Sequence, residues 1–373
     1  SFDEVSITLF DRNNPVADAG PNQALCTPNT TTVMAGSAII FPATGAWTLI
    51  SGSGVIANPG SPTTSVSGLA IGENVFQWSV ANGPCGNPLT TDLVSIFIYD
   101  ASNPLANAGA DQQICTPLTG ATFAGSAVTF PATGQWTLVS GQGSITDPSN
   151  PTSTVTGLGV GLNVFAWTVD NGPCSGVTTD QVGLTLYDLN SPPAAAGPDQ
   201  SFCTPTSTAV MAGNTPTAPA IGVWTLTQGT AQFGDVNDPG TTVTGLSVGE
   251  NILTWTINNG LCGISHDDVS IFIFDANNPA AAAGPDQAYC TPQDSTYLQG
   301  NTPIFPAQGT WSTIDGAGLF ADTHDPATKV VGMSIGPNTF VWTMDNGPCP
   351  GAITTDTITV IVYSDSTAAA FAG

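Results

Sequence analysis

The chain has 373 residues and carries 27 acidic side chains against only two basic ones, Arg12 and Lys329, which gives a formal net charge of −25. This charge argues against nucleic acid and anionic membranes as partners, because both repel an acidic surface. The 42 glycines and 30 prolines fall between apolar runs, where they favour turns and disfavour helices. We therefore expect an almost purely β structure. No run of 18 apolar residues is present, so no direct membrane insertion is predicted for this segment.

Short extended segments with period-two alternation follow one another along the chain. Within residues 101–188 they are predicted at 107–115, 122–125, 135–139, 153–158, 163–169 and 181–187. The strongest of them places Phe165, Trp167 and Val169 on one face. Six or seven such strands with no helix signal predict an antiparallel β-sandwich of immunoglobulin-like architecture.

Two cysteines and two tryptophans recur four times with the same spacing of 21, 31 and 7 residues. The four sets are Cys26, Trp47, Trp78 and Cys85; Cys115, Trp136, Trp167 and Cys174; Cys203, Trp224, Trp255 and Cys262; and Cys290, Trp311, Trp342 and Cys349. A period of nearly 90 residues is long enough for each repeat to hold its own core. The tryptophans are interpreted as core residues because they occupy identical positions in every repeat.

The repeat pattern divides the whole chain. We predict repeat 1 at residues 12–100, repeat 2 at 101–188, repeat 3 at 189–275 and repeat 4 at 276–364. Residues 1–11 match the last strand of a preceding repeat, and residues 365–373 match the start of a following one. Each last strand runs through an Asp- and Pro-containing joint directly into the next repeat, so the joints are expected to be stiff and the array an elongated rod.

The two cysteines of each repeat lie 59 residues apart and no Cys-x-x-Cys pattern or histidine partner accompanies them. This favours disulfides over a metal site, with reduced structural cysteines as the alternative. The predicted pairs lie within repeats: Cys26–Cys85, Cys115–Cys174, Cys203–Cys262 and Cys290–Cys349. Disulfides imply an oxidising, extracellular compartment.

The joints admit two interpretations. Asp11, Asp100, Asp188 and Asp275, with Asn13, Ser102, Asn190 and Asn277 two residues later and Asp111, Asp199 and Asp286 nearby, suggest a Ca²⁺ site. The alternative is an Asx turn that needs no metal. No other cofactor is predicted.

A second repeated acid lies eight residues before each joint, at Asp3, Asp92, Asp180, Asp267 and Asp356. We interpret it as a residue at the start of a strand that accepts hydrogen bonds from backbone amides. Catalytic groups do not repeat: His266 and His324 fall at different points of repeats 3 and 4, and repeats 1 and 2 have none. No enzyme activity is therefore predicted.

Several strings carry a family resemblance: Ala-x-Ala-Gly-Pro-Asp-Gln at 194–200 and 281–287, Gly-x-Trp-Thr, Val-Thr-Gly-Leu-x-x-Gly-x-Asn, and Trp-Thr-x-x-Asn-Gly-x-Cys. Together they resemble the PKD-like repeats of giant Bacteroidota cell-surface proteins, including gliding-motility adhesins. The resemblance extends over essentially the whole chain. It implies an array of β-sandwiches on the bacterial cell surface, exported by type IX secretion.

The leading functional hypothesis is a structural stalk or filament segment of a large adhesin, serving surface attachment and gliding motility. Its partners would be the neighbouring repeats of the same chain. One alternative is that the repeats bind surface glycans through variable loops such as 51–61 and 140–149. Another is lateral assembly of identical chains into a fibre or sheath.

Overall fold

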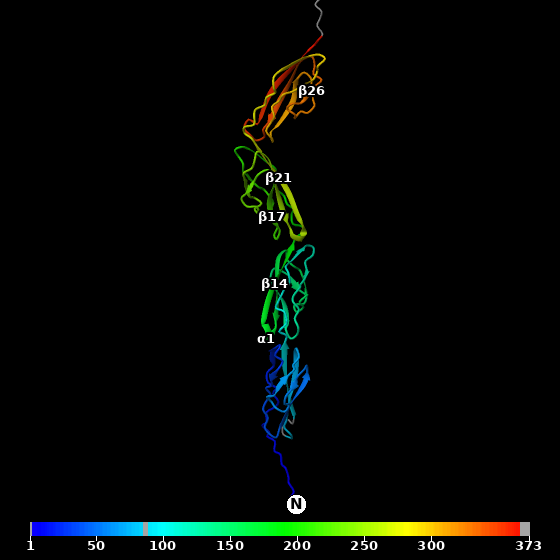
Figure 1. Ribbon diagram of the computed structural model, residues 1–373, viewed down its shortest axis with the longest axis vertical. Coiled ribbons are helices and arrows are strands. Elements are labelled where there is room, and N and C mark those ends of the chain that lie inside the picture. The colour runs from blue at the N-terminus through cyan, green and yellow to red at the C-terminus, as the bar shows by residue number, and fades with distance from the viewer. Residues whose placement is uncertain (1, 85–88, 366–373) are drawn as a thin grey trace, which may run out of the picture. The chain divides into compact units, whose positions relative to one another are not determined.

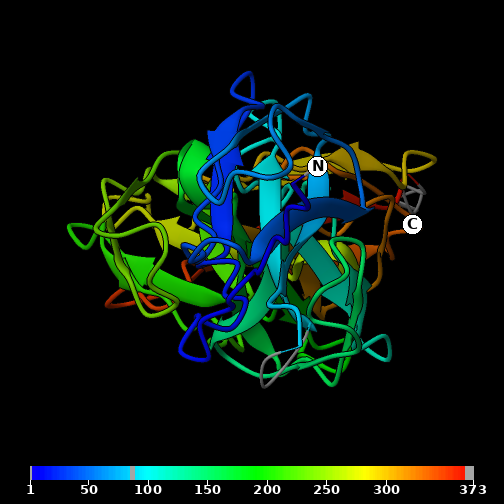
Figure 2. The same cartoon turned by 90° about the horizontal axis from the view of Figure 1, so that it is seen from below.

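The computed structural model describes residues 2–84 and 89–365. Strands are the main regular element of the ribbon (Figure 1 and Figure 2). The chain divides into two compact units, Ser1–Leu189 and Asn190–Gly373, each of which holds two of the four predicted repeats. The all-β, tandem β-sandwich prediction is confirmed.

Repeat 1 forms a four-stranded sheet in the order β1-β7-β6-β3 and a three-stranded sheet in the order β2-β5-β4. Its strands are β1 (Gln23–Cys26), β2 (Thr32–Val33), β3 (Thr44–Ser51), β4 (Val55–Ile56), β5 (Ser65–Ser67), β6 (Gly72–Ala81) and β7 (Leu89–Tyr99). All neighbours are antiparallel except β1 and β7, which run parallel and end together at Cys26 and Tyr99.

Repeat 2 has the same two sheets, in the orders β8-β14-β13-β10 and β9-β12-β11. Its elements are β8 (Gln112–Cys115), β9 (Ala121–Thr122), β10 (Thr133–Ser140), β11 (Ser144–Ile145), β12 (Thr154–Thr156), β13 (Gly161–Asp170), the one-turn helix α1 (Gly172–Ser175) and β14 (Val177–Tyr187). The sequence pattern missed β11 and α1, because two-residue strands and single turns carry too few residues to show a period.

Repeats 3 and 4 repeat this topology, with sheet orders β15-β21-β20-β17, β16-β19-β18, β22-β28-β27-β24 and β23-β26-β25. Repeat 3 contains β15 (Gln200–Cys203), β16 (Ala209–Val210), β17 (Ile221–Gln228), β18 (Gln232–Phe233), β19 (Thr242–Thr244), β20 (Gly249–Asn258), the 3₁₀ turn η1 (Gly260–Cys262) and β21 (Ile264–Phe274). Repeat 4 contains β22 (Gln287–Cys290), β23 (Thr296–Tyr297), β24 (Gln308–Asp315), β25 (Leu319–Phe320), β26 (Lys329–Val331), β27 (Gly336–Asp345) and β28 (Ile353–Tyr363).

A pair of tryptophans forms the centre of each core, as the repeated spacing predicts. In repeat 2, Trp136 of β10 lies directly opposite Trp167 of β13, with ring centroids 5.0 Å apart, and both side chains are buried. The second ring lies over Gly134, where an added Cβ would overlap it. The same pairs recur as Trp47 with Trp78, Trp224 with Trp255, and Trp311 with Trp342. Each core is therefore completed within one repeat.

Residues 2–10 form no strand, and their match to the last strand of a preceding repeat stays a prediction. The reason is pairing: β7, the equivalent strand of repeat 1, is held by β6 on one side and β1 on the other, whereas segment 2–10 pairs with no strand among the described residues. Val5, Ile7 and Leu9 are correspondingly exposed. Of the segment predicted to begin a following repeat, 366–373 lies outside the described residues.

Candidate functional site: the junction between consecutive repeats

The two cysteines of one repeat lie at opposite ends of its sandwich. Cys115 is the last residue of β8 and is aligned with Tyr187, the last residue of β14. Cys174 lies in α1, just before β14 begins at Val177. Eleven residues of strand at about 3.3 Å each separate these ends by about 33 Å. A disulfide requires Cα atoms within about 7 Å, so the two cysteines of one repeat cannot meet.

The cysteines instead bridge consecutive repeats. Cys26 of repeat 1 is bonded to Cys174 of repeat 2, and Cys203 of repeat 3 to Cys349 of repeat 4, each with a Cα–Cα distance of 5.1 Å. The predicted pairs Cys26–Cys85, Cys115–Cys174, Cys203–Cys262 and Cys290–Cys349 are therefore wrong. Cys115 and Cys262 are also disulfide-bonded, Cys290 is a free and exposed thiol, and Cys85 lies outside the described residues. At the first junction, α1 contacts the ends of β1 and β7.

An aromatic ring packs on a glycine beside each bridge. The ring of Tyr99, at the end of β7, covers Gly172 so closely that an added Cβ would lie 2.7 Å from it. Phe274 covers Gly347 in the same way in the second unit, at 2.6 Å. Gly172 and Gly347 also have φ values of +49° and +55°, which an L residue adopts only with strain. Glycine is therefore required twice over in the Asn-Gly-x-Cys string.

The asparagine before each glycine fixes the linking segment. Nδ2 of Asn171 donates a 3.0 Å hydrogen bond to the backbone carbonyl of Asp100, and Nδ2 of Asn346 donates one of 2.9 Å to that of Asp275. Asn171 and Asn346 are both buried. In the first unit Asn103 also donates to Oδ1 of Asn171, at 3.2 Å. A buried amide whose donor is bonded to the linking chain holds the next repeat in one orientation.

A second aromatic contact joins repeats 1 and 2 at the first junction. Phe130, on the loop before β10, lies edge-on to Phe97 of β7, with ring centroids 6.5 Å apart. The junction residues were not predicted from the sequence, although they recur in it. The Asn-Gly-x-Cys string and the Tyr/Phe-Asp joint recur together, but nothing in the spacing reveals that one repeat's string meets the previous repeat's joint.

The carboxylates of Asp11, Asp100 and Asp275 accept hydrogen bonds within their own turns. Oδ1 of Asp11, Asp100 and Asp275 accepts hydrogen bonds from the backbone amides of Asn13, Ser102 and Asn277 at 2.8–2.9 Å, which confirms the Asx-turn interpretation for these joints. Oδ1 of Asp188 accepts a 3.2 Å hydrogen bond from Thr116 Oγ1, and Asn190 begins the second unit. The Ser102 hydroxyl and amide lower the pKa of Asp100, whose carboxylate is exposed to solvent.

The further acids expected near the joints lie elsewhere. Asp111, Asp199 and Asp286 accept hydrogen bonds from backbone amides of Gly183, Ser270 and Thr359, in the middle of the last strands. Among residues 2–84 and 89–365, no three His, Cys, Asp or Glu side chains gather in a metal-binding group. Ca²⁺ binding at the joints stays a prediction, and Asp111, Asp199 and Asp286 lie away from the joints where they were expected as ligands.

The second repeated acid performs the predicted role. Oδ2 of Asp92, Asp180, Asp267 and Asp356 accepts a 2.8 Å hydrogen bond from the backbone amide of Ala19, Ala108, Ala196 and Ala283 respectively. Each bond ties the incoming chain of a repeat to that repeat's own last strand.

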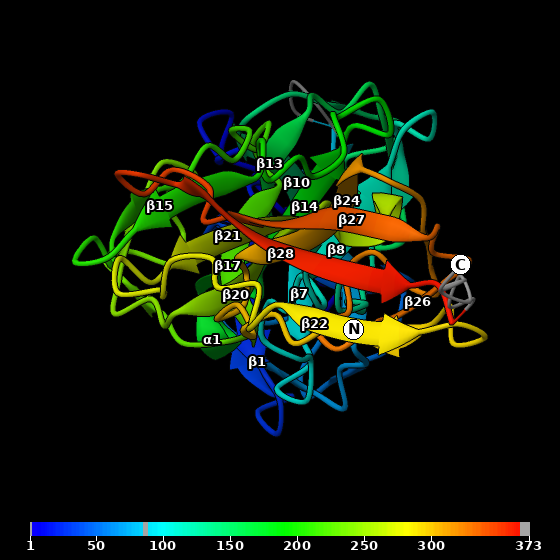
Figure 3. The same ribbon diagram turned by 90° about the horizontal axis from the view of Figure 1, so that it is seen from above.

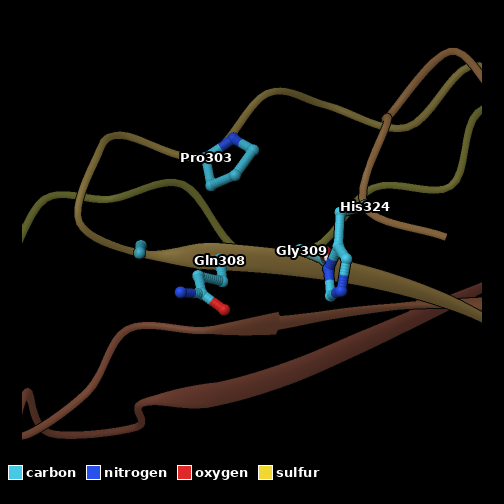
Figure 4. A pocket seen from close by; sticks show the side chains of 5 residues that line it. Pro303, Gln308, Gly309 and His324 are labelled. Atoms are coloured by element: carbon cyan, nitrogen blue, oxygen red, sulfur yellow. Dashed lines mark hydrogen bonds between the residues drawn. The ribbon is translucent and has the colours of Figure 1, made fainter. Parts of the chain in front are cut away.

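The two histidines, His266 and His324, are exposed. Nδ1 of His324 lies 3.0 Å from the carbonyl oxygen of Gly309, on the rim of a shallow hollow that Pro303 and Gln308 also line (Figure 4). The corresponding hollow of repeat 3 has Asn237 and no histidine on its wall. The hollow therefore offers no catalytic constellation that the repeats share.

Comparisons with known proteins find partial similarity to curated sequences and to solved structures. No family model matches the sequence. The mouse dyslexia-associated protein KIAA0319 homolog is 27% identical over 221 residues, which cover 54% of this chain and 20% of that protein. The human dyslexia-associated protein KIAA0319 is 26% identical over 222 residues, with the same coverage. The matched part thus spans about a fifth of these curated relatives.

Solved structures that match parts of the chain include titin domains I67–I69 as an E-to-A variant, with 11% identity, a TM-score of 0.33, and coverage of 70% of this chain and 98% of that one. The complex of Dpr2 Ig1-Ig2 with DIP-Theta Ig1-Ig3 has 11% identity, a TM-score of 0.37, and coverage of 69% and 100%. The PKD domain of the KIAA 1837 protein has 23% identity, a TM-score of 0.21, and coverage of 25% and 93%. These likenesses concern the fold alone. In the described part of the chain, every helix is too short to span a bilayer.

Proposed function

We propose that the chain is a load-bearing stalk segment of a large adhesin on the bacterial cell surface, used for attachment and for gliding. The observation that carries this proposal is the covalent bridge between consecutive repeats, Cys26–Cys174 in one unit and Cys203–Cys349 in the other. A spacer that only separates two functional domains has no need of such bridges. A chain under tension does.

Each bridge provides a second covalent path beside the backbone. The backbone from Cys26 to Cys174 runs through 148 residues, and that from Cys203 to Cys349 through 146. These stretches include the tryptophan pairs of all four repeats. A pulling force transmitted through the bridges bypasses the cores, so the sheets are not forced to unravel and the stalk keeps its length.

The noncovalent contacts at the junction supply stiffness. The ring of Tyr99 on Gly172 and the hydrogen bond from Asn171 to Asp100 resist bending, while the bridge resists separation. We infer from this combination that the two repeats of a unit are held stiffly together. Disulfides also agree with an oxidising extracellular location, and the resemblance to Bacteroidota surface repeats supports type IX export. We infer a purely structural role with no enzymatic activity.

Single-molecule stretching of the full chain, held at its two ends, tests the proposal. With the bridges intact, unfolding should release little length. Reduction should free both bridged stretches, of 148 and 146 residues, and each should add about 500 Å at roughly 3.6 Å per residue. Circular dichroism of the reduced, alkylated chain is the control that its sheets stay folded before pulling. Equal contour lengths in oxidised and reduced protein would refute a load-bearing role.

A further inference from the structure

The end of repeat 4 carries the first half of a junction. Cys290, the last residue of β22, is aligned with Tyr363, the last residue of β28, as Cys26 is with Tyr99 and Cys203 with Phe274. Figure 3 shows β22 and β28 side by side. This end therefore presents a cysteine and an aromatic residue in the register that the two complete junctions use.

The segment leaving this end is held as it is at the complete junctions. The amide of Thr291 donates to the carbonyl of Tyr363 at 2.9 Å, and the amide of Asp365 donates to Thr291 Oγ1 at 2.9 Å. In repeat 1 the same two bonds join Thr27 with Tyr99 and Ala101 with Thr27, at 3.0 and 2.9 Å. The direction in which the chain leaves repeat 4 is thus already set for a further repeat.

Within residues 2–84 and 89–365, this end lacks the contacts that a second repeat supplies at the two complete junctions. Cys290 is a free, exposed thiol, whereas Cys26 and Cys203 are half-buried and bonded. Tyr363 is 55% exposed, whereas Tyr99 and Phe274 are half-buried. The joint has Ser364 in place of Asp100, but the junction asparagine bonds to a backbone carbonyl, which serine supplies equally well.

We propose that this end is an attachment site for a repeat of the same type that follows in the chain, and that Cys290 forms a disulfide with the second cysteine of that repeat. The occupant is a loop of the form Asn-Gly-x-Cys, whose glycine fits under Tyr363. The match of residues 368–373 to 279–284, where a repeat opens, agrees with this occupant. The inference rests on the proposed function and deepens it, because each repeat of the stalk would then be joined to the next by a disulfide.

The bond forms by thiol–disulfide exchange with a disulfide oxidant such as oxidised glutathione. The Cys290 thiolate attacks the oxidant, forms a mixed disulfide and releases one thiolate. The second cysteine, as thiolate, then attacks the Cys290 sulfur and releases the other half of the oxidant. Two protein thiols are oxidised to one disulfide, and the oxidant disulfide is reduced to two thiols, because its released thiolates take up the two protons that the protein thiols lose.

A longer chain tests the proposal. The full sequence is extended after Gly373 by a copy of residues 285–365, which completes a fifth repeat. In the added copy the first cysteine is changed to Ser, and Cys85→Ser is introduced, so that Cys290 and the added second cysteine are the only unassigned thiols. After oxidation with glutathione disulfide, alkylation and mass spectrometry should find no free thiol, and peptide mapping should join Cys290 to the added cysteine.

The 373-residue chain with Cys85→Ser is the matched control and should keep one alkylated thiol, at Cys290. A second extended variant, with Ala in place of the added repeat's Asn-Gly-x-Cys glycine, should close this bridge several-fold more slowly. The proposal is overturned if Cys290 stays alkylatable in the extended chain while Cys26–Cys174 and Cys203–Cys349 form, or if Cys290 links separate molecules instead. Thiol mapping and stretching have independent outcomes. Cys290 can stay unbonded while the stretching experiment supports the load-bearing role, and Cys290 can be bonded while the stretching experiment refutes that role.

Discussion

An aromatic ring packs on a glycine both in the core of a repeat and at the junction between repeats, but the two contacts have different roles. In the core, Trp167 covers Gly134, and both residues belong to repeat 2. At the junction, Tyr99 covers Gly172 across the boundary between repeats 1 and 2. The difference is that the core ring, Trp167, is fully buried, whereas Tyr99 and Gly172 at the junction are half-buried and are accompanied by a disulfide and a hydrogen bond.

The core therefore stabilises each repeat by itself, and the junction couples neighbouring repeats. Each repeat folds around its own tryptophans, so the junction is free to specialise in holding neighbours together. Substitutions in the core should therefore unfold one repeat and leave its neighbour folded. Substitutions at the junction should leave both repeats folded and change how they are coupled.

Removal of the bridge should have the largest effect. In Cys26→Ser/Cys174→Ser, the loop of 148 residues is no longer closed, and the chain-entropy relation assigns about 5 kcal/mol to such a loop when both repeats unfold. Circular dichroism should show unchanged sheets, and urea unfolding should show the loss. Cys290→Ser, which removes only a free thiol, is the control and should unfold like the parent. Loss of sheet structure in the double variant would contradict a pure junction role.

Trp167→Ala tests the core. Truncating this fully buried ring should cost about 3–5 kcal/mol through the cavity that it leaves. Hydrogen exchange should show lost protection in β13 of repeat 2 while β6 of repeat 1 stays protected. Leu138→Ala, at a partly exposed position of the adjacent β10, is the matched control and should change stability by about 0.5 kcal/mol or less. Equal loss of protection in both repeats would disprove independent cores.

Gly172→Ala tests the ring contact at the junction. It should destabilise through the φ of +49°, by about 1–2 kcal/mol, and further through overlap with Tyr99. Gly157→Ala, with φ +68° and no neighbour within 4 Å, isolates the cost of φ alone. We expect the concentration of dithiothreitol that reduces half of Cys26–Cys174 to fall for Gly172→Ala and to stay unchanged for Gly157→Ala. Identical midpoints in the two variants would show that the ring contact does not support the bridge.

Features that follow from sequence periodicity were predicted, whereas those that depend on the relative direction of paired strands were not. The burial of Phe165, Trp167 and Val169 follows from alternation alone, and the role of Asp180 from its place at a strand start. The disulfide pairing was wrong because the parallel pairing of β8 with β14 leaves no sign in four residues of strand. Without that pairing, nothing shows that Cys115 lies at the far end of an eleven-residue strand from Cys174.

The smallest effect concerns the turn that begins the linking segment. Ser102 donates two hydrogen bonds to the Asp100 carboxylate and lowers its pKa, so the ionised form is favoured in the folded protein. Stability from this turn is present above the ordinary carboxyl pKa and is lost as the pH falls through the lowered one. In Ser102→Ala the side-chain bond is lost while the backbone bond is kept. Carbon-detected NMR titration should therefore show the Asp100 pKa rise part of the way back, whereas the pKa of Asp147, which Ser149 lowers in the same manner, should not move. An unchanged Asp100 titration would show that the serine hydroxyl does not hold this turn.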